Sequence, residues 1–406
     1  MNHIGAIDNQ NILFLQGPMG SFFKRLDNLF RKKGAKTYKI AFNAADWFYS
    51  NKDNITSYKG TPKLWRKFIT DFLIRNKIDK VFIFGDCRFY QKTTKKIACA
   101  LGIEVFVFEE GYVRPDFVTL ERHGVNGNSK LPRLKSFYET LPKTSESNEA
   151  YPMKNSLYAM IMSAMTYYLI ANAFAFLYPH YIHHRSFSTA KEAFYGIRNF
   201  TRKIRYVQKD RPYNRRIKTD LSRKYFFVPL QTSADAQIRK HSRFKNIEKF
   251  IETTLNSFAK YADKGHFIIF KHHPFDRGRA NYTNYINTLA KNLGIEKRVI
   301  TLYELCVPDA LKNALGTVTI NSTVGLSSLY HSTPTITLGK SIYDIEGLTC
   351  KKMSLDDFWQ NRTAPDEVLF KKFRNFLIKN SQINGSFYGK MGDLKKIGDN
   401  LEHNPS

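Results

Sequence analysis

Two adjacent carboxylates end a fully apolar short stretch of this 406-residue chain. Residues 105–108 read Val-Phe-Val-Phe and lead directly into Glu109, Glu110 and Gly111, with Arg114 close behind. Such a run predicts a buried parallel strand, and open α/β sheets bind ligands at the carboxyl ends of such strands. The two carboxylates would point to opposite faces, Gly111 would permit a sharp turn, and Arg114 could hold one carboxylate ionised. We interpret this as an active-site edge; a solvated strand end with a structural Glu–Arg pair is the alternative.

A second candidate edge follows strands in the C-terminal half of the chain. An apolar run at 266–270 leads into Lys271 and His273, which could meet a phosphate or protonate a leaving phosphate group. Residues 321–329 follow another strand and open a helix rich in small hydroxyl residues, whose free N–H groups suit a phosphate. Gln231 ends a third strand of the same predicted sheet, so these groups should share one rim. The alternatives are a turn histidine satisfied by backbone and a plain helix cap.

Polar residues also follow two other strands of the N-terminal half. The segment from Gln16 to Gly20 links the first strand to the first helix, and Gly17 and Gly20 allow a tight turn with free amides for an anion or an acceptor. It matches neither the dinucleotide-binding fingerprint nor a P-loop. Asp86 and Arg88 follow the strand at 80–84 and join this rim, although an ordinary strand-end turn explains them equally well.

Strand-like and helix-like segments alternate through both halves, which predicts two parallel sheets covered by helices. We therefore expect two Rossmann-like domains facing each other across a cleft, the GT-B architecture, with that last step resting on analogy of fold. The predicted domains are 1–150, a helical insertion at 151–220, 221–380, and a fraying tail at 381–406. The predicted strands are 11–15, 37–42, 80–84, 104–108, 225–230, 266–270, 299–302, 316–320 and 334–338, and the main helices are 22–33, 62–75, 93–101, 246–260, 282–292 and 325–330.

The balance of charge indicates an anionic partner. Lys and Arg number 64 against 35 Asp and Glu, a formal charge of +29, which suits a phospholipid surface, a nucleotide or a polyanion. Nucleic acid is disfavoured, because the basic residues form no recognised motif. The four cysteines have neither zinc-ligand nor disulfide-framework spacing, and the first apolar segment is too short for a signal peptide, so a cytoplasmic protein is expected.

The segment between the two predicted domains has a distinct composition. Residues 155–179 carry no charge, and 159–178 approach the length of a bilayer span, although Ser, Thr, Asn and Tyr lower their hydrophobicity. We favour a helix in or against the membrane interface; a buried interdomain helix and a transmembrane span are the alternatives. A basic tract suited to an anionic leaflet follows it. It comprises His183, His184, Arg185, Lys191, Arg198, Arg202, Lys203, Arg205, Lys209, Arg211, Arg215, Arg216 and Lys218.

Several of these motifs, taken in order, resemble the KpsS/LipB family of capsular polysaccharide proteins. They are the 16–20 loop, Phe42-Asn43 with Asp46-Trp47, Gly85-Asp-Cys-Arg88, Glu109-Glu-Gly-Tyr-Val-Arg-Pro-Asp116 with Thr119-Leu-Glu121, Gly124-Val-Asn126, Lys271-His-His-Pro274 and the block at 321–349. The Glu-Glu-Gly-Tyr-x-Arg-Pro motif is quite specific to this family. The His-Pro and Ser/Thr-x-Gly elements also look similar to the two-module KpsC proteins and to CMP-sugar transferases.

This resemblance implies a retaining β-Kdo transferase that uses CMP-Kdo and a phosphatidylglycerol-type lipid to start the linker of the capsule chain. It implies Glu110 as the catalytic carboxylate, as nucleophile or base, with Glu109 in support and His273 at the phosphate. The donor-binding residues would be Gln231, Lys271, Asn321, Ser322, Thr323 and Gly325, and the acceptor or cleft residues Gln16, Gly17, Gly20, Asp86, Arg88 and Arg114. No cofactor and no metal are expected, because the Asp-x-Asp motif is absent and a departing CMP needs positive or N–H partners.

The implied partners are the anionic lipid acceptor, the cytoplasmic surface of the inner membrane, and other capsule biosynthesis and export proteins. Two other functions stay open. One is a non-catalytic adaptor of capsule export that binds the anionic polysaccharide through its basic surface. The other is a GT-B enzyme that uses a different CMP- or CDP-activated donor, such as CDP-glycerol.

Overall fold

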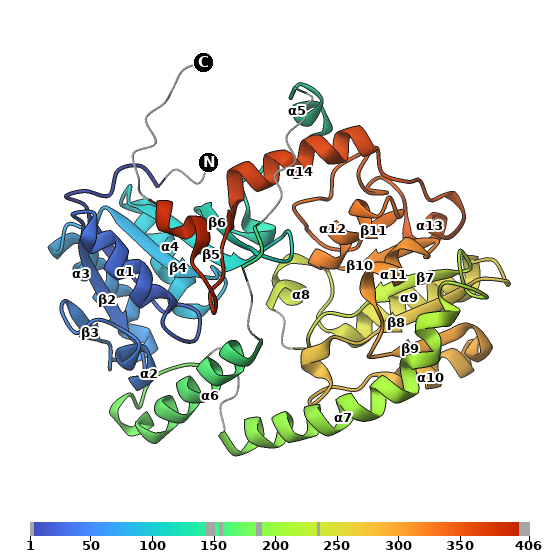
Figure 1. The fold of residues 1–406 in the computed structure, drawn as a ribbon, viewed down its shortest axis with the longest axis horizontal. Helices are drawn as coiled ribbons and strands as arrows, with labels where there is room; N and C mark the ends of the chain where they lie inside the picture. Colours follow the sequence, from blue (N-terminus) through green and yellow to red (C-terminus); the bar gives the residue numbers. More distant parts are fainter. Residues whose placement is uncertain (1–3, 143–150, 154–156, 184–188, 234–235, 398–406) are drawn as a thin grey trace. The chain divides into compact units, whose positions relative to one another are not determined.

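The chain folds into two compact α/β units. The computed structural model describes residues 4–142, 151–153, 157–183, 189–233 and 236–397 (Figure 1). Unit 1 comprises Met1–Lys130, Glu146–Thr189 and Phe376–Ser406, and unit 2 comprises Leu131–Ser145 and Ala190–Asn375. Each unit is built around its own sheet, so the prediction of two Rossmann-like domains is confirmed at the level of fold class.

The sheet of unit 1 has the strand order β12-β6-β5-β4-β1-β2-β3. Five neighbouring strands, from β3 to β5, run parallel, whereas β6 is antiparallel to β5 and β12 is antiparallel to β6. The acidic strand β5 thus has one parallel and one antiparallel neighbour, rather than lying inside a wholly parallel sheet. The bounds are β1 Asn11–Phe14, β2 Lys36–Ala41, β3 Ile55–Ser57, β4 Lys80–Phe84, β5 Glu104–Glu110, β6 Phe117–Arg122 and β12 Gln382–Asn384.

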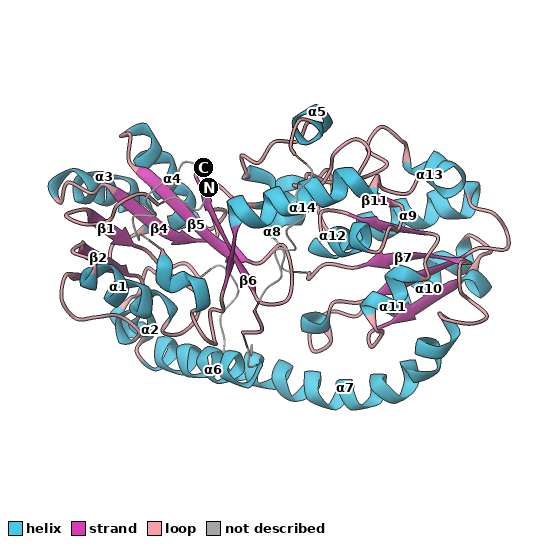
Figure 2. Cartoon of the chain, turned by 45° about the horizontal axis from the view of Figure 1, so that its top comes forward, coloured by secondary structure: helices cyan, strands magenta, loops and turns pink. Residues whose placement is uncertain are grey.

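Helices cover both faces of this sheet, with α1 on one face and α3 and α4 on the other (Figure 2). Alternate residues of each strand point to opposite faces, so Phe82 packs with α1 while Val81 packs with α3 and α4. The helices are α1 Phe22–Lys32, α2 Ala44–Phe48, α3 Trp65–Arg75, α4 Phe89–Ala100 and α6 Leu157–Ala173, with short turns of 3₁₀ helix at η1 Pro62–Leu64, η2 Asn126–Asn128, η3 Ala175–Leu177 and η6 Gly392–Lys396.

The sheet of unit 2 is parallel throughout, in the order β11-β10-β7-β8-β9. Phe226 and Val228 of β7 pack with α9 and α13 on one face, and Tyr225 and Phe227 pack with α11 on the other. The strands are β7 Tyr225–Pro229, β8 Phe267–Lys271, β9 Val299–Leu302, β10 Gly316–Thr319 and β11 Thr335–Thr337. The helices are α5 Lys135–Glu139, α7 Thr189–Arg216, α8 Ala236–His241, α9 Ile247–Tyr261, α10 Thr283–Asn292, α11 Val307–Lys312, α12 Thr323–Tyr330 and α13 Leu355–Asn361, with η4 Pro274–Asp276 and η5 Glu296–Arg298.

The chain is partitioned differently from the predicted domains. The segment 151–220 is not a separate insertion, because α6 belongs to unit 1 and α7 to unit 2. The C-terminal part is not a fraying tail as far as residue 397, because α14 Glu367–Ser381 leads the chain back to unit 1, where β12 joins the sheet. Phe387 and Leu394 beyond it are buried in the core beside α1. His184 and Arg185 of the predicted basic tract lie outside the described residues.

The uncharged helix α6 is apolar on all sides but is covered on one side only. Tyr167 and Ala171 are buried against Ala45 of α2, whereas Tyr158, Met165 and Leu169 are exposed. Among the described residues, no helix combines the length and the hydropathy that crossing a bilayer requires.

Candidate functional site

The two carboxylates of unit 1 occupy the carboxyl end of β5 and lie in different surroundings. Glu109 is partly buried; its Oε2 accepts from Asn126 Nδ2 at 3.5 Å, and its Oε1 accepts from the Glu110 backbone N–H at 3.1 Å. Glu110 is exposed and is in register with Val118 of β6. Glu110 is therefore the carboxylate of this pair that reaches solvent at the strand end.

Desolvation dominates the electrostatics of Glu110. It raises the pKa of this carboxyl group above the ordinary value, although the side chain has access to solvent, and the charge of Arg114 acts in the opposite direction. Arg114 thus favours the ionised form, as the sequence predicts, but does not outweigh desolvation. Tyr388 lies near the same carboxylate: burial raises the pKa of its hydroxyl, and the negative charge of Glu110 adds to this increase.

The turn after Glu110 is shaped by close backbone approach. A Cβ added to Gly111 would lie 2.2 Å from the carbonyl oxygen of Phe117, so no larger residue fits without movement of the backbone. Gln382 of β12 accepts hydrogen bonds from the N–H groups of Tyr112, at 2.9 Å, and Val113, at 3.3 Å. The acidic strand end is consequently held by a strand that lies 270 residues further along the chain.

The glycine loop after β1 is part of a buried network rather than an open anion site. Gln16 is buried, and its Nε2 lies within hydrogen-bonding distance of Asp46 Oδ2 at 3.1 Å and of the Tyr167 and Tyr181 hydroxyls at 2.9 Å. Burial raises the pKa of Asp46, against the opposing charge of Lys39. This network joins the loop to α2 and α6.

The two glycines of this loop are required for packing. A Cβ on Gly17 would lie 2.7 Å from the ring of Phe23, and Gly20 has a φ of +117° and lies beside Ser163 of α6. The sequence predicts free amides here for an anion or an acceptor, and α6 instead packs next to the turn. Whether an acceptor contacts these residues stays a prediction.

Asp86 and Arg88 play different parts at the end of β4. Asp86 is buried and forms an ion pair with Lys95 at 2.7 Å, and it accepts a hydrogen bond from Asn128 at 2.9 Å, which fits the ordinary strand-end turn. Arg88 packs over the ring of Phe84 and donates to Gln16 Oε1 at 3.4 Å. The positive charge of Arg88 also opposes the increase in the pKa of Tyr388, to which the charge of Glu110 adds, so Arg88 and Glu110 both act on Tyr388.

In unit 2, strand register brings three predicted donor segments to one sheet edge. Pro229 of β7 pairs with Lys271 of β8, and Phe227 of β7 pairs with Thr317 of β10. The carboxyl ends of the three parallel strands therefore lead out at the same edge, with β7 in the middle. Gln231 and Asn321 meet there directly, since Gln231 Nε2 donates to Asn321 Oδ1 at 2.9 Å and Gln231 Oε1 accepts from the Asn321 N–H at 3.3 Å.

The N-terminus of α12 completes this edge. Ser322 caps the helix and accepts from the Val324 N–H at 3.2 Å, while Thr323 begins the first turn. Tyr343 donates from its hydroxyl to the Ser322 carbonyl at 2.5 Å, and a Cβ on Gly325 would lie 2.2 Å from that hydroxyl oxygen. Gly325 is thus needed so that Tyr343 can brace the cap, a role for which the local sequence pattern contains no signal.

The two histidines after β8 have separate environments. His272 is buried; its ring stacks on Tyr303 at 4.1 Å, its Nε2 accepts from the Tyr282 N–H at 3.1 Å, and burial lowers its pKa to about 4. His273 is partly exposed and its Nδ1 accepts from the Phe275 N–H at 3.2 Å, which fits the turn histidine; in the neutral ring this leaves the proton on Nε2. Burial also lowers the pKa of Lys271.

The two rims belong to different units, so the expectation that Glu110 and His273 share one crevice stays a prediction. Within the residues that the structure describes, no three His, Cys, Asp or Glu side chains gather in a way that could hold a metal ion. The sequence reasoning missed the buried Gln16–Asp46–Tyr167 network and the bracing by Tyr343, because both depend on residues far apart in the chain.

Comparison with known proteins places this geometry in a family. Residues 79–388 match the family of capsule polysaccharide biosynthesis proteins. The chain is 37% identical to the capsule polysaccharide export protein KpsS of Escherichia coli, over 94% of this chain and 98% of that protein. It is 36% identical to the capsule polysaccharide modification protein LipB of Neisseria meningitidis serogroup A, over 94% of this chain and 92% of that protein.

Among solved structures, the KpsC β-Kdo 2,7 transferase of Thermosulfurimonas dismutans aligns with a TM-score of 0.43 at 14% identity, over 89% of this chain and 88% of that one. The family match and the two capsule relatives confirm the resemblance to KpsS and LipB. The chain belongs to the family of capsule polysaccharide biosynthesis proteins.

Proposed function

We propose that the protein is a retaining β-Kdo transferase that moves Kdo from CMP-Kdo to phosphatidylglycerol or its lyso form, and so starts the lipid linker of a capsular polysaccharide. Membership of the capsule family supports a role in capsule synthesis or export. The observation that carries the enzymatic proposal is the solvent-accessible Glu110 at the end of β5, whose carboxylate interacts with the charge of Arg114 on a rim whose motif is typical of this family.

In the proposed reaction Glu110 attacks the anomeric carbon of Kdo. The bond from that carbon to the phosphate oxygen breaks, and CMP leaves with the electron pair. A lipid hydroxyl then displaces the carboxylate from the same carbon and loses its proton to a base, so two inversions give net retention. Because desolvation raises its pKa, the ionised Glu110 is a better nucleophile than an ordinary carboxylate.

We assign donor binding to unit 2. The Gln231–Asn321 pair and the capped N-terminus of α12 supply neutral N–H and hydroxyl groups that suit the cytidine and the phosphate of CMP. His273, with a proton on Nε2, could donate a hydrogen bond to the departing phosphate. The proposal needs no metal ion, and it includes a location at the cytoplasmic face of the inner membrane, where the lipid acceptor lies.

The test is a transfer assay with purified protein, CMP-Kdo and a fluorescent lyso-phosphatidylglycerol, followed by mass spectrometry. We expect the lipid to gain the mass of one Kdo residue and Glu110→Gln to abolish this gain. Glu104→Gln is the matched control, because Glu104 lies on the same strand at its amino end, in ion pairs with Lys80 and Arg122. No mass gain with the wild type, or an undiminished gain with Glu110→Gln, would refute the proposal.

A second measurement separates nucleophile from base. Rapid quenching without acceptor should leave a Kdo adduct on the peptide that contains Glu110 if this residue is the nucleophile. Turnover without any adduct would assign Glu110 the role of a base. Binding of a capsule polysaccharide without any turnover would instead favour the export adaptor.

A further inference from the structure

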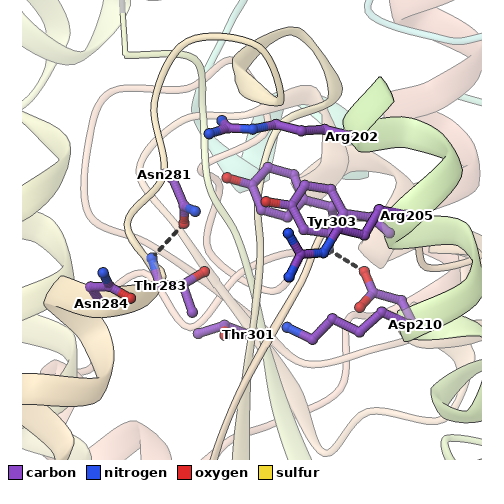
Figure 3. A pocket seen from close by; sticks show the side chains of 10 residues that line it. Arg202, Arg205, Asp210, Asn281, Thr283, Asn284, Thr301 and Tyr303 are labelled. Atoms are coloured by element: carbon purple, nitrogen blue, oxygen red, sulfur yellow. Dashed lines mark hydrogen bonds between the residues drawn. The ribbon is translucent and has the colours of Figure 1, made fainter. Parts of the chain in front are cut away.

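Unit 2 contains a cavity that belongs to neither rim. It lies between α7, the end of β9 and the start of α10 and has a volume of about 330 Å³, within the range of pockets that hold small ligands (Figure 3). Stacked rings of Tyr206 and Tyr303, with centroids 4.3 Å apart, form part of its wall. The other lining residues are Arg202, Arg205, Lys209, Asp210, Asn281, Thr283, Asn284 and Thr301.

The cavity has an excess of unsatisfied positive charge. Arg205 and Lys209 form no hydrogen bond or ion pair with any described residue, whereas Arg202 donates to the carbonyl of Arg277 at 3.0 Å. The one carboxylate, Asp210, is buried and already accepts from the N–H groups of Tyr303, at 2.8 Å, and Glu304, at 2.9 Å. Two cations therefore stay available for an anion, beside hydroxyl and amide groups that could bind its oxygens.

The outer face of the same helix is apolar and uncovered. Five side chains at helical spacing are between 46% and 68% exposed: Phe194, Ile197, Phe200, Ile204 and Val207. Large apolar side chains on a helix normally face a core, so a stripe of this length needs an explanation.

The cavity and the stripe adjoin along α7. At 100° per residue, Arg205 and Lys209 border the apolar stripe on one side and Lys203 borders it on the other. An apolar face with cationic borders is typical of helices that lie in the interface of an anionic membrane. A second copy of the chain would cover the stripe and leave the cations unused, and a free polysaccharide would use the cations and leave the stripe in water. A phospholipid surface satisfies both.

We propose that α7 docks unit 2 on an anionic bilayer, with its apolar stripe in the interface and the phosphate of one phospholipid head group in the cavity. Arg205 and Lys209 would bind the phosphate, and Asn281 and Thr283 would bind the neighbouring oxygens. The choice of phospholipid rests on the proposed function, which it deepens by naming a lipid site that shares no residue with the two rims.

The experiment is flotation of the full chain with vesicles of phosphatidylcholine alone or mixed with phosphatidylglycerol. Arg205→Gln/Lys209→Gln should weaken binding to the mixed vesicles about 30-fold, at about tenfold or less for each lost cation. Phe200→Ser/Ile204→Ser should weaken it at least about tenfold. The matched control, Lys291→Gln/Lys297→Gln, removes the same charge from exposed positions at the far end of α10 and in η5, and should bind as the wild type does.

Each outcome decides for or against the proposal. Soluble glycerol phosphate should compete with vesicles for the wild type and not for Arg205→Gln/Lys209→Gln. The single variant Arg205→Lys keeps the positive charge and should retain most of the binding to vesicles. Equal binding to phosphatidylcholine alone, equal loss in the Lys291/Lys297 control, or cavity variants that float like the wild type would overturn the proposal, provided that circular dichroism shows folded protein. Stripe variants that abolish self-association but not flotation would also overturn it, in favour of a second copy. A wild type that floats but transfers no Kdo would refute the transferase and leave the docking site intact.

Discussion

The rim of unit 1 and the rim of unit 2 both terminate parallel strands, but they offer opposite kinds of chemistry. The first is charged, with Glu110 beside Arg114 and a carboxyl pKa that desolvation raises. The centre of the second, which we call the neutral rim, consists of uncharged groups, the Gln231–Asn321 pair and a capped helix N-terminus, with Lys271 and His273 beside it at the end of β8. A charged rim should act through its protonation state and influence the rate of the chemical step. A neutral rim of donors should act through binding, with little dependence on pH.

The largest effect should come from removing the charge of the first rim. Under the proposed function, Glu110→Gln should lower kcat at least about 10³-fold, as expected for a nucleophile or a general base, while the KM for CMP-Kdo changes little. Ser322→Ala should do the opposite, raising KM with a smaller change in kcat. Steady-state kinetics of both variants checks this; a rise in KM alone for Glu110→Gln would erase the distinction between the rims.

A smaller effect is expected from a side chain added at Gly325, in the space that the Tyr343 hydroxyl occupies at the second rim. Gly325→Ala should destabilise the protein by about 1–3 kcal/mol through overpacking, because the new Cβ would meet the Tyr343 hydroxyl. Tyr343→Phe in the same chain removes that oxygen and should recover part of the loss. Urea unfolding of the two single variants and the double variant gives the answer, and strictly additive losses would contradict the proposed contact.

The neutral rim should still show pH dependence in its stability through His272. Its folded pKa of about 4 lies below its ordinary value of 6.5, so the unfolded chain binds the extra proton between these values. The contribution of neutral His272 to the free energy of unfolding is therefore fully present above pH 6.5. The free energy of unfolding falls as the pH drops toward 4, by about 2 kcal/mol between pH 7.5 and 5. His272→Gln should lower stability at pH 7.5 and flatten this dependence. An unchanged slope in urea unfolding would show that other groups cause it.

The smallest effect should be the coupling within the neutral rim. Gln231→Ala and Asn321→Ala should each destabilise the protein slightly, and a double-mutant cycle should show a coupling of about 1 kcal/mol, since the two amides are each other's partners. As the comparison, Gln231→Ala with Ser332→Ala should be additive. A coupling near zero would mean that the pair does not hold the rim together.

Much of the fold could be predicted because its signals are local. Short apolar runs separated by amphipathic segments predicted β1, β2, β4, β5 and β7–β11 within one or two residues at each end. Of the strands that the prediction missed, β12 has no such pattern, because it is three residues long and pairs with β6 from a distant part of the chain. Likewise, the prediction placed α6 and α7 in one insertion because they are adjacent in sequence, whereas α6 packs against α2 in unit 1 and α7 packs on the core of unit 2.

By itself, the sequence determined the family, the parallel strands of the two sheets and the strand ends where polar residues gather, because residue type, period and motif spacing are local properties. The tertiary structure decided which of those residues are free to act. Gln16 and Asp86 form hydrogen bonds or ion pairs with residues of other elements, Glu110 is exposed, and α7 carries an apolar stripe that adjoins a cationic cavity. Burial and partnership are decided by contacts between distant segments, and it is these contacts that set the charge and accessibility of each side chain.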